Sequence, residues 1–289
     1  MERGFLFIKG VFRRMSKVLK KYAKGNLDAD LKVISLGLGV QSTAVYLMSS
    51  MGCKLPRADY AIFSDPQAEH YKTYDILKWL LKWKDDNNGI PIIVNRDKNL
   101  LEDILNKIPK GERVASIPAF SKNNDGLLMR QCTSDYKIQP VIKSSRKLHG
   151  LKPRQRMKPT EMWLGISTDE IERMKDSRLY NIKYFYPLIY HNISRNDCID
   201  FFKENNFPVP VKSSCVFCPY HSNSFWNDMK KDKKTWDTII KVDQTIRDNP
   251  RLKEKQYLHR SCKPIDEIDF EDKQLPIFDD FDCEGHCGL

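Results

Sequence analysis

The sequence lacks a long apolar run. Its longest apolar run near the start, residues 5–8 (FLFI), is too short for the apolar region of a signal peptide and has no small-residue cleavage site behind it. No other stretch approaches the roughly 20 apolar residues of a membrane-spanning helix. These absences argue against secretion and membrane insertion. We therefore expect a cytoplasmic protein with no membrane partner.

Acidic residues are scarce in two segments. Residues 1–24 contain eight Lys or Arg side chains and one acidic side chain, and they supply about +7 of the net charge of +11. Residues 143–158 contain seven basic side chains and no acidic one. Basic segments attract polyanions, so both predict contacts with a nucleic acid, either tRNA or DNA. A solvated charged surface is the alternative for each.

The chain is long and apolar enough to bury a sizeable core, with 289 residues and 40% hydrophobic content. Three apolar runs predict strands: one that begins at Val33, one at 60–63 and one at 91–94. Between successive strands, apolar residues at helical spacing predict a helix at 43–50 and another at 73–84. Such βαβαβ alternation predicts an α/β fold with a doubly wound, Rossmann-like parallel sheet.

The rest of the chain completes the predicted organisation. Residues 137–148 and 195–205 are expected to form helices, 161–165 a further strand, and 109–131 a long loop. Ser194 and Asp197 resemble a capping box at the start of the second of these helices. We expect three regions, namely a basic arm at 1–30, a nucleotide-binding domain at 31–206 and a cysteine-rich region at 207–289.

A glycine-rich turn follows the first predicted strand. Gly37 and Gly39 allow a tight turn and a close approach of the backbone to a phosphate, and Ser42 and Thr43 begin the next helix. Ser35 ends the strand. The pattern predicts an anion-binding loop, although a Gly-x-Gly turn between strand and helix is often only a tight turn.

Eight cysteines in a reducing compartment indicate thiols or metal ligands rather than a disulfide framework. Cys53 and Cys198 fall on or beside helix patterns and are expected to pack in the core. The remaining six are candidate ligands of an iron-sulfur cluster or a structural zinc ion: Cys132, Cys215, Cys218, Cys262, Cys283 and Cys287.

Together these motifs resemble the PP-loop family of adenine-nucleotide alpha-hydrolases, and within it the phosphoadenosine-phosphosulfate (PAPS) reductase-like branch with its phage-borne members. Five elements carry the resemblance, in the family's order, over roughly residues 32–222: Gly37-Leu-Gly39-Val-Gln41-Ser42; Phe63-Ser-Asp65; Arg130-Gln-Cys132 with Lys137 and Pro140; Gly165-Ile-Ser-Thr-Asp169-Glu170 with Arg173; and Cys215-x-x-Cys218.

The resemblance implies ATP, or the sulfonucleotides PAPS and APS, on the 37–43 loop beside Gly165. It implies that Asp65 helps to place Mg²⁺ or ribose. It also implies that three cations neutralise charge at the alpha-phosphate and pyrophosphate: Lys137, Arg173 and Arg178. A substrate oxygen then attacks the alpha-phosphorus, pyrophosphate leaves, and sulfur can displace the adenylated group.

Two positions depart from the family's pattern. Gln41 replaces the usual aspartate of the loop, and Thr133 stands where cluster-bearing reductases have a second adjacent cysteine. Three matched cysteines remain, at 132, 215 and 218. The resemblance therefore implies a 4Fe-4S cluster whose fourth iron is open or is held by another cysteine, such as Cys283 or Cys287.

Three functions follow as hypotheses. The first is an adenylating enzyme that modifies, and in one form thiolates, a nucleic acid or nucleotide with a sulfur donor. The second is a sulfonucleotide reductase with Cys287 as nucleophile and a thioredoxin-like reductant. The third is a nucleotide-responsive nucleic-acid-binding protein with structural zinc. Replacing Cys287 with serine separates the first two, because it would stop reduction and leave pyrophosphate release intact.

Overall fold

The computed structural model describes residues 25, 28–114, 117–122, 124–127 and 130–270, and the basic segment 1–24 of the predicted arm lies outside them. The chain folds as two compact units, each built from separate segments. The first comprises the described part of Met1–Phe63 together with Asp75–Val94 and Val141–Val211. The second comprises Ser64–Tyr74, Asn95–Pro140 and the described part of Lys212–Leu289.

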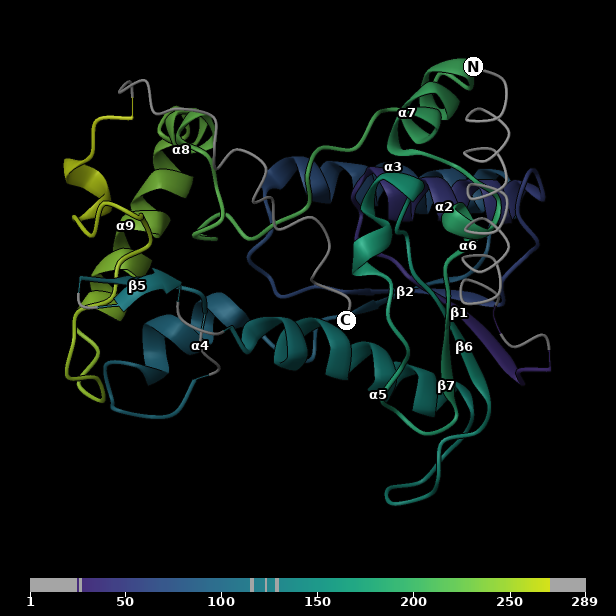
Figure 1. The fold of residues 1–289 in the computed structure, drawn as a ribbon, viewed down its shortest axis with the longest axis horizontal. Helices are drawn as coiled ribbons and strands as arrows, with labels where there is room; N and C mark the ends of the chain where they lie inside the picture. Colours follow the sequence, from purple (N-terminus) through teal and green to yellow (C-terminus); the bar gives the residue numbers. More distant parts are fainter. Residues whose placement is uncertain (1–24, 26–27, 115–116, 123, 128–129, 271–289) are drawn as a thin grey trace, which may run out of the picture. The chain divides into compact units, whose positions relative to one another are not determined.

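The first unit contains an all-parallel sheet of five strands in the order β3-β2-β1-β6-β7 (Figure 1). The strands are β1 (Leu31–Ser35), β2 (Tyr60–Ser64), β3 (Ile92–Asn95), β6 (Thr160–Trp163) and β7 (Ile182–Phe185). In register, Ile34 of β1 lies between Ala61 of β2 and Trp163 of β6. This sheet confirms the predicted α/β class and its Rossmann-like arrangement.

Helices cover both faces of this sheet, as a parallel sheet requires. They are α2 (Val40–Met51), α3 (Tyr71–Asp86), α5 (Gln139–Leu148), α6 (Pro187–Tyr190) and α7 (Arg195–Glu204). Side chains of α2, α3 and α7 form one apolar cluster with Ile34 and Trp163. Val33 and Ile62 are fully buried outside that cluster, and Figure 1 shows α5 on the side of the sheet away from α2 and α3.

The second unit has its own apolar core and little sheet. Its elements are α4 (Leu100–Lys107), the hairpin β4 (Phe120–Ser121) and β5 (Asn124–Leu127), the π-helix η1 (Ser134–Ile138), α8 (Asn223–Met229), α9 (Lys233–Arg247) and η3 (Ile265–Glu267). Ile104 of α4 and Ile239 of α9 lie in one cluster with the fully buried Trp226. The hairpin falls within the segment predicted as a long loop.

The two units differ from the three predicted regions. The boundary expected at residue 207 is near the observed one at Lys212, but 64–74 and 95–140 belong to the second unit rather than to the nucleotide-binding domain. The capping box is confirmed, since the Ser194 Oγ accepts from the Asp197 N–H at 3.1 Å and an Asp197 carboxylate oxygen accepts from the Ser194 N–H at 2.7 Å.

None of the helices in the part of the chain that the structure describes combines the length and apolarity that a bilayer-spanning segment needs.

Candidate functional site

The glycine-rich loop lies where the strand order reverses. From β1 the chain winds outward through β2 and β3 on one side, and later through β6 and β7 on the other. The segments that leave the carboxyl ends of β1 and β6 are therefore neighbours, and such a switch point is where α/β sheets bind ligands. Gly37 and Gly39 follow β1, and Gly165 follows β6.

The N-terminus of α2 is available to an anion. Gly39 is its N-cap, no side chain caps the helix, and its first turn carries no acidic residue. The Gly37 N–H donates to the Ser42 Oγ at 3.2 Å, which ties the loop to the helix. A Cβ atom built on Gly39 would have no described atom within 4 Å. Backbone N–H groups at such a terminus, with the helix dipole, attract negative charge.

The strained residue of the loop is Leu38 and not a glycine. Leu38 has φ of 61°, in the left-handed region, whereas neither Gly37 nor Gly39 has a positive φ. Its side chain is fully buried in the apolar cluster of the first unit, which holds this conformation in place. A non-glycine residue there is disfavoured by roughly 1–2 kcal/mol. The sequence pattern had assigned the tight turn to the two glycines.

Gly165 permits a close approach of two backbone segments. A Cβ atom at this position would lie 2.6 Å from both the Cα and the backbone nitrogen of Ser42. The resemblance predicted Gly165 as a cofactor-binding residue. In the structure it packs against the start of α2, so its lack of a side chain shapes the loop.

Gln41 is the centre of a buried polar network. Its Nε2 donates to Glu170 at 3.1 Å and lies 3.3 Å from the Ser167 Oγ, while its Oε1 accepts from the Arg195 guanidinium at 3.3 Å. Arg173 forms an ion pair with Glu170 at 2.6 Å. The amide thus has a fixed orientation, and a carboxylate is present beside it although position 41 itself carries none.

Arg195 was missed in the sequence reasoning. Its backbone N–H donates to Asp169, which also accepts from Ser167 at 3.2 Å. The helix start predicted at Ser194 was the available signal, because it places residue 195 in the first turn of α7. Within the described residues, buried polar atoms without a hydrogen-bond partner include the Arg173 Nε and the Thr43 Oγ1 of this region.

The structure does not bring Arg178 to this network. The segment after η2 (Thr168–Arg173) runs back along β7. The Lys175 N–H donates to the Tyr186 hydroxyl near the end of β7, and the Asn181 carbonyl accepts from the Thr160 N–H at the start of β6. Arg178 is exposed, and the carbonyl of its neighbour Leu179 accepts from the N–H of Ile182, the first residue of β7. Ser35, the last residue of β1, is half-buried beside the loop.

Asp65 lies in the second unit, directly after β2. One carboxylate oxygen accepts from the Gln67 N–H at 2.8 Å and the Tyr74 hydroxyl at 2.9 Å, and the other forms an ion pair with Arg96 at 2.9 Å. Burial, together with the nearby Asp65 charge, raises the pKa of Tyr74 well above its usual value, so the phenol remains a donor. The buried carboxylate is thus neutralised by protein groups.

Three of the predicted cysteine ligands share one cavity in the second unit. Cys132, Cys215 and Cys218 line a space of about 30 Å³. The Cys218 N–H donates to the Cys215 carbonyl at 3.0 Å, which makes the tight turn expected of a Cys-x-x-Cys pair. Lys137 lines the same cavity.

Two buried side chains, Glu69 and His221, form hydrogen bonds or ion pairs with residues that line or adjoin this cavity. Lys137 and Glu69 form an ion pair at 2.7 Å, and Glu69 also accepts from the Ser213 hydroxyl at 3.1 Å. His221 Nε2 donates to the Cys215 carbonyl at 2.8 Å, and its ring stacks on Phe225. Burial lowers the pKa of His221 to about 3, so the ring stays neutral. Sequence reasoning missed His221, although it lies three residues after Cys218.

Three cysteine thiols are a donor set that suits a thiophilic metal such as zinc or iron. In the described structure, however, their side chains do not converge on one point where a metal ion could bind all three. Within the described residues, no three His, Cys, Asp or Glu side chains are placed to hold a metal together. The buried Ser214 hydroxyl lines the cysteine cavity without a hydrogen-bond partner there.

The other cysteines fall into three groups. Cys283 and Cys287 lie outside the described residues. Cys262 does not line the cysteine cavity. Cys53 and Cys198 pack in the core of the first unit, as predicted, and burial raises the pKa of the Cys198 thiol to about 12.

Comparison with known proteins adds no family to this description, because neither a protein-family model nor a curated protein matches the chain.

Proposed function

We propose that the protein is an ATP pyrophosphatase of the PP-loop kind, which adenylates an acceptor on a nucleic acid or nucleotide. The observation that carries the proposal is the uncapped N-terminus of α2 at the switch point of the sheet, with Gly39 open to a ligand. The order of motifs around it, from Gly37 to Cys218, resembles that of the PP-loop family and supports the proposal.

The residues of the first unit suit this chemistry. The N–H groups at the start of α2 and the Ser42 hydroxyl bind phosphate oxygens. Arg173 and Arg195 supply positive charge, and each is oriented by the Gln41 network. An acceptor oxygen forms a bond to the alpha-phosphorus as the bond to pyrophosphate breaks. Gln41 cannot ligate Mg²⁺ as a carboxylate does, and Glu170 is the acidic group beside it.

ATP binding and pyrophosphate release test the proposal. Arg173→Ala is expected to weaken ATP binding at least tenfold, since charge-assisted contacts contribute about 1.5–3 kcal/mol each. Lys175→Ala is the matched control, because this exposed side chain lies two residues away and its backbone makes the contact with Tyr186. Equal ATP affinity in the wild type and the Arg173 variant, measured by calorimetry, would contradict the assignment.

The cysteine cavity is proposed as the metal centre, with Cys132, Cys215 and Cys218 as thiolate ligands. A cluster held there would supply an iron for binding sulfur, as thiolation of the acceptor requires, while a zinc ion would be structural. Cys283 and Cys287 stay candidate fourth ligands. Basic segments 1–24 and 143–158 stay predicted nucleic-acid contacts, and the described cations of the second segment lie on α5 and on the loop before β6.

Metal content of anaerobically purified protein tests the metal centre. We expect bound iron with absorbance at about 400 nm, lost in Cys215→Ser because a serine hydroxyl is a poor ligand for cluster iron. Cys53→Ser is the control, since Cys53 packs in the other unit and should leave metal content unchanged. Zinc in place of iron would favour a structural site, and no bound metal in the wild type would refute the centre.

A further inference from the structure

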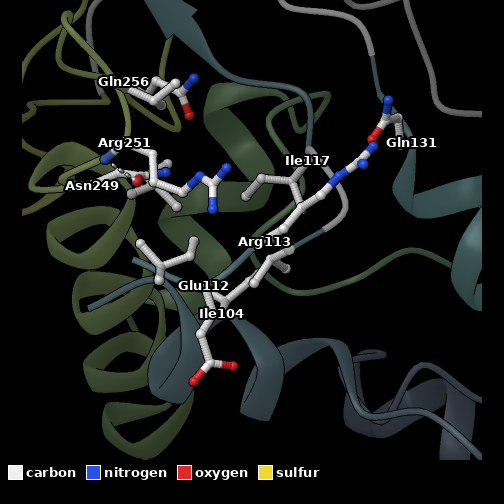
Figure 2. A pocket seen from close by; sticks show the side chains of 12 residues that line it. Ile104, Glu112, Arg113, Ile117, Gln131, Asn249, Arg251 and Gln256 are labelled. Carbon is white, nitrogen blue, oxygen red and sulfur yellow. Dashed lines mark hydrogen bonds between the residues drawn. The ribbon is translucent and has the colours of Figure 1, made fainter. Parts of the chain in front are cut away.

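A second cavity, of about 280 Å³, lies in the second unit near the ends of α4 and α9 (Figure 2). Its floor is apolar and buried, and consists mainly of Ile104, Ile108, Ile117 and Ile246. Its remaining walls carry two guanidinium and three amide groups: Arg113, Arg251, Gln131, Asn249 and Gln256. The volume is close to the lower end of the range for small-molecule sites, roughly 300–1,000 Å³.

Hydrogen bonds within the protein fix part of the polar wall of this cavity. The Arg251 guanidinium donates to the Gly111 carbonyl at 2.9 Å, and its backbone N–H donates to the Asn249 side chain at 3.0 Å. In Figure 2 this guanidinium points toward the centre of the cavity, whereas the carboxylate of Glu112 points away from both arginines. The Arg113 guanidinium lies beside Gln131, at another side of the cavity, so the cavity has a cation on two sides of its apolar floor.

The surroundings of the cavity are also basic. Three exposed lysines lie in the same two segments as the arginines: Lys110, Lys253 and Lys255. The acidic side chain between them in sequence, Glu254, is hydrogen-bonded to Ser121. Positive charge thus extends beyond the cavity, where it can meet further phosphates of a strand.

We propose that this cavity binds one nucleotide, and that Arg113 and Arg251, at two sides of the cavity, supply the positive charge that attracts its phosphate. The base lies on the isoleucine floor, and its edge faces amide side chains, which both donate and accept hydrogen bonds. The nucleotide can be a free nucleoside monophosphate or one residue of a single strand. All of the residues that line this cavity belong to the second unit, whereas the proposed ATP loop belongs to the first.

The cavity adjoins the cysteine cavity along the chain. Ile117 and Gln131 line the larger cavity, and the residues that follow them in the sequence, Pro118 and Cys132, line the cysteine cavity. A nucleotide bound here therefore contacts the two segments that also form the wall of the proposed metal centre. This placement suits a site that holds the nucleic-acid substrate.

Calorimetric titration with the four ribonucleoside 5′-monophosphates, and with the matching nucleosides, tests the proposal. We expect at least one monophosphate to bind, with its affinity reduced about tenfold or more in Arg113→Ala and in Arg251→Ala. Lys78→Ala, which removes an exposed cation from the first unit, should leave this affinity within about twofold.

A five-residue single-stranded oligonucleotide identifies the source of the nucleotide. Tighter binding than the monophosphate, with mutual competition, supports a strand, and equal affinity supports a free nucleotide. The proposal is overturned if no monophosphate binds at concentrations up to about 10 mM. It is also overturned if correctly folded Arg113→Ala, checked by circular dichroism, binds as tightly as the wild type.

Discussion

Gly165→Ala is expected to disrupt the loop between β1 and α2 and to abolish ATP binding. The added Cβ would lie 2.6 Å from the Ser42 nitrogen and Cα, so the backbone of one segment must move. Overpacking of this kind costs about 1–3 kcal/mol, and more where backbone cannot yield. The displaced N–H groups would no longer converge on a phosphate. Chemical denaturation and ATP titration measure the two effects.

Gly39→Ala is the matched variant for this prediction. Its added methyl meets no described atom within 4 Å, so the free energy of unfolding should change by no more than about 0.5 kcal/mol. ATP binding should nevertheless fall, because the methyl occupies the place proposed for a phosphate. A Gly165→Ala protein with wild-type stability and ATP affinity would show that the two segments do not approach so closely.

Glu69→Gln is expected to destabilise the second unit by about 3–5 kcal/mol. The Glu69 side chain is fully buried and that of Lys137 is 15% exposed, so the substitution leaves a largely buried ammonium group without this carboxylate. Unfolding in guanidinium chloride, followed by the fluorescence of the second unit's tryptophans, measures the loss. Metal content should fall with it, because both residues stabilise the wall of the cysteine cavity.

An exposed ion pair provides the control for Glu69. Lys78 and Asp75 are 79% and 62% exposed, and Asp75→Asn should change the stability by less than about 0.5 kcal/mol. Adding Lys137→Met to Glu69→Gln should restore much of the loss, since it removes the ammonium charge that had lost its Glu69 carboxylate. A loss of under about 1 kcal/mol in Glu69→Gln alone would mean that the Lys137 ammonium is well solvated in the folded protein.

Local patterns predicted the first half of the sheet well. The apolar run at Val33, the helical spacing after Thr73 and the capping box at Ser194 each depend on residues a few positions apart, and each corresponds to an observed element. β7 was missed because it has four residues with an exposed lysine, Lys183, among them. α9 was missed because its apolar face lies in a lysine-rich stretch.

The candidate sites were predicted only in part. The sequence identified Gly37, Gly39 and Cys132 as residues of interest, because their types and spacing carry chemical meaning. It did not indicate that Leu38 takes the left-handed conformation, or that Arg195 reaches Gln41 from 154 positions away. The contact between Arg195 and Gln41 depends on the order in which the strands enter the sheet, and the conformation of Leu38 depends on the core into which its side chain packs.

By itself, the sequence determined the parallel α/β class, the position of the glycine-rich loop and the candidate cysteines. Tertiary structure alone decided that 64–74 and 95–140 join the C-terminal region, and that Cys132 meets the Cys215 pair in one cavity. The reason is that the spacing of apolar residues that marks a strand or a helix extends over only a few positions. A core, in contrast, forms where apolar faces from distant parts of the chain fit one another.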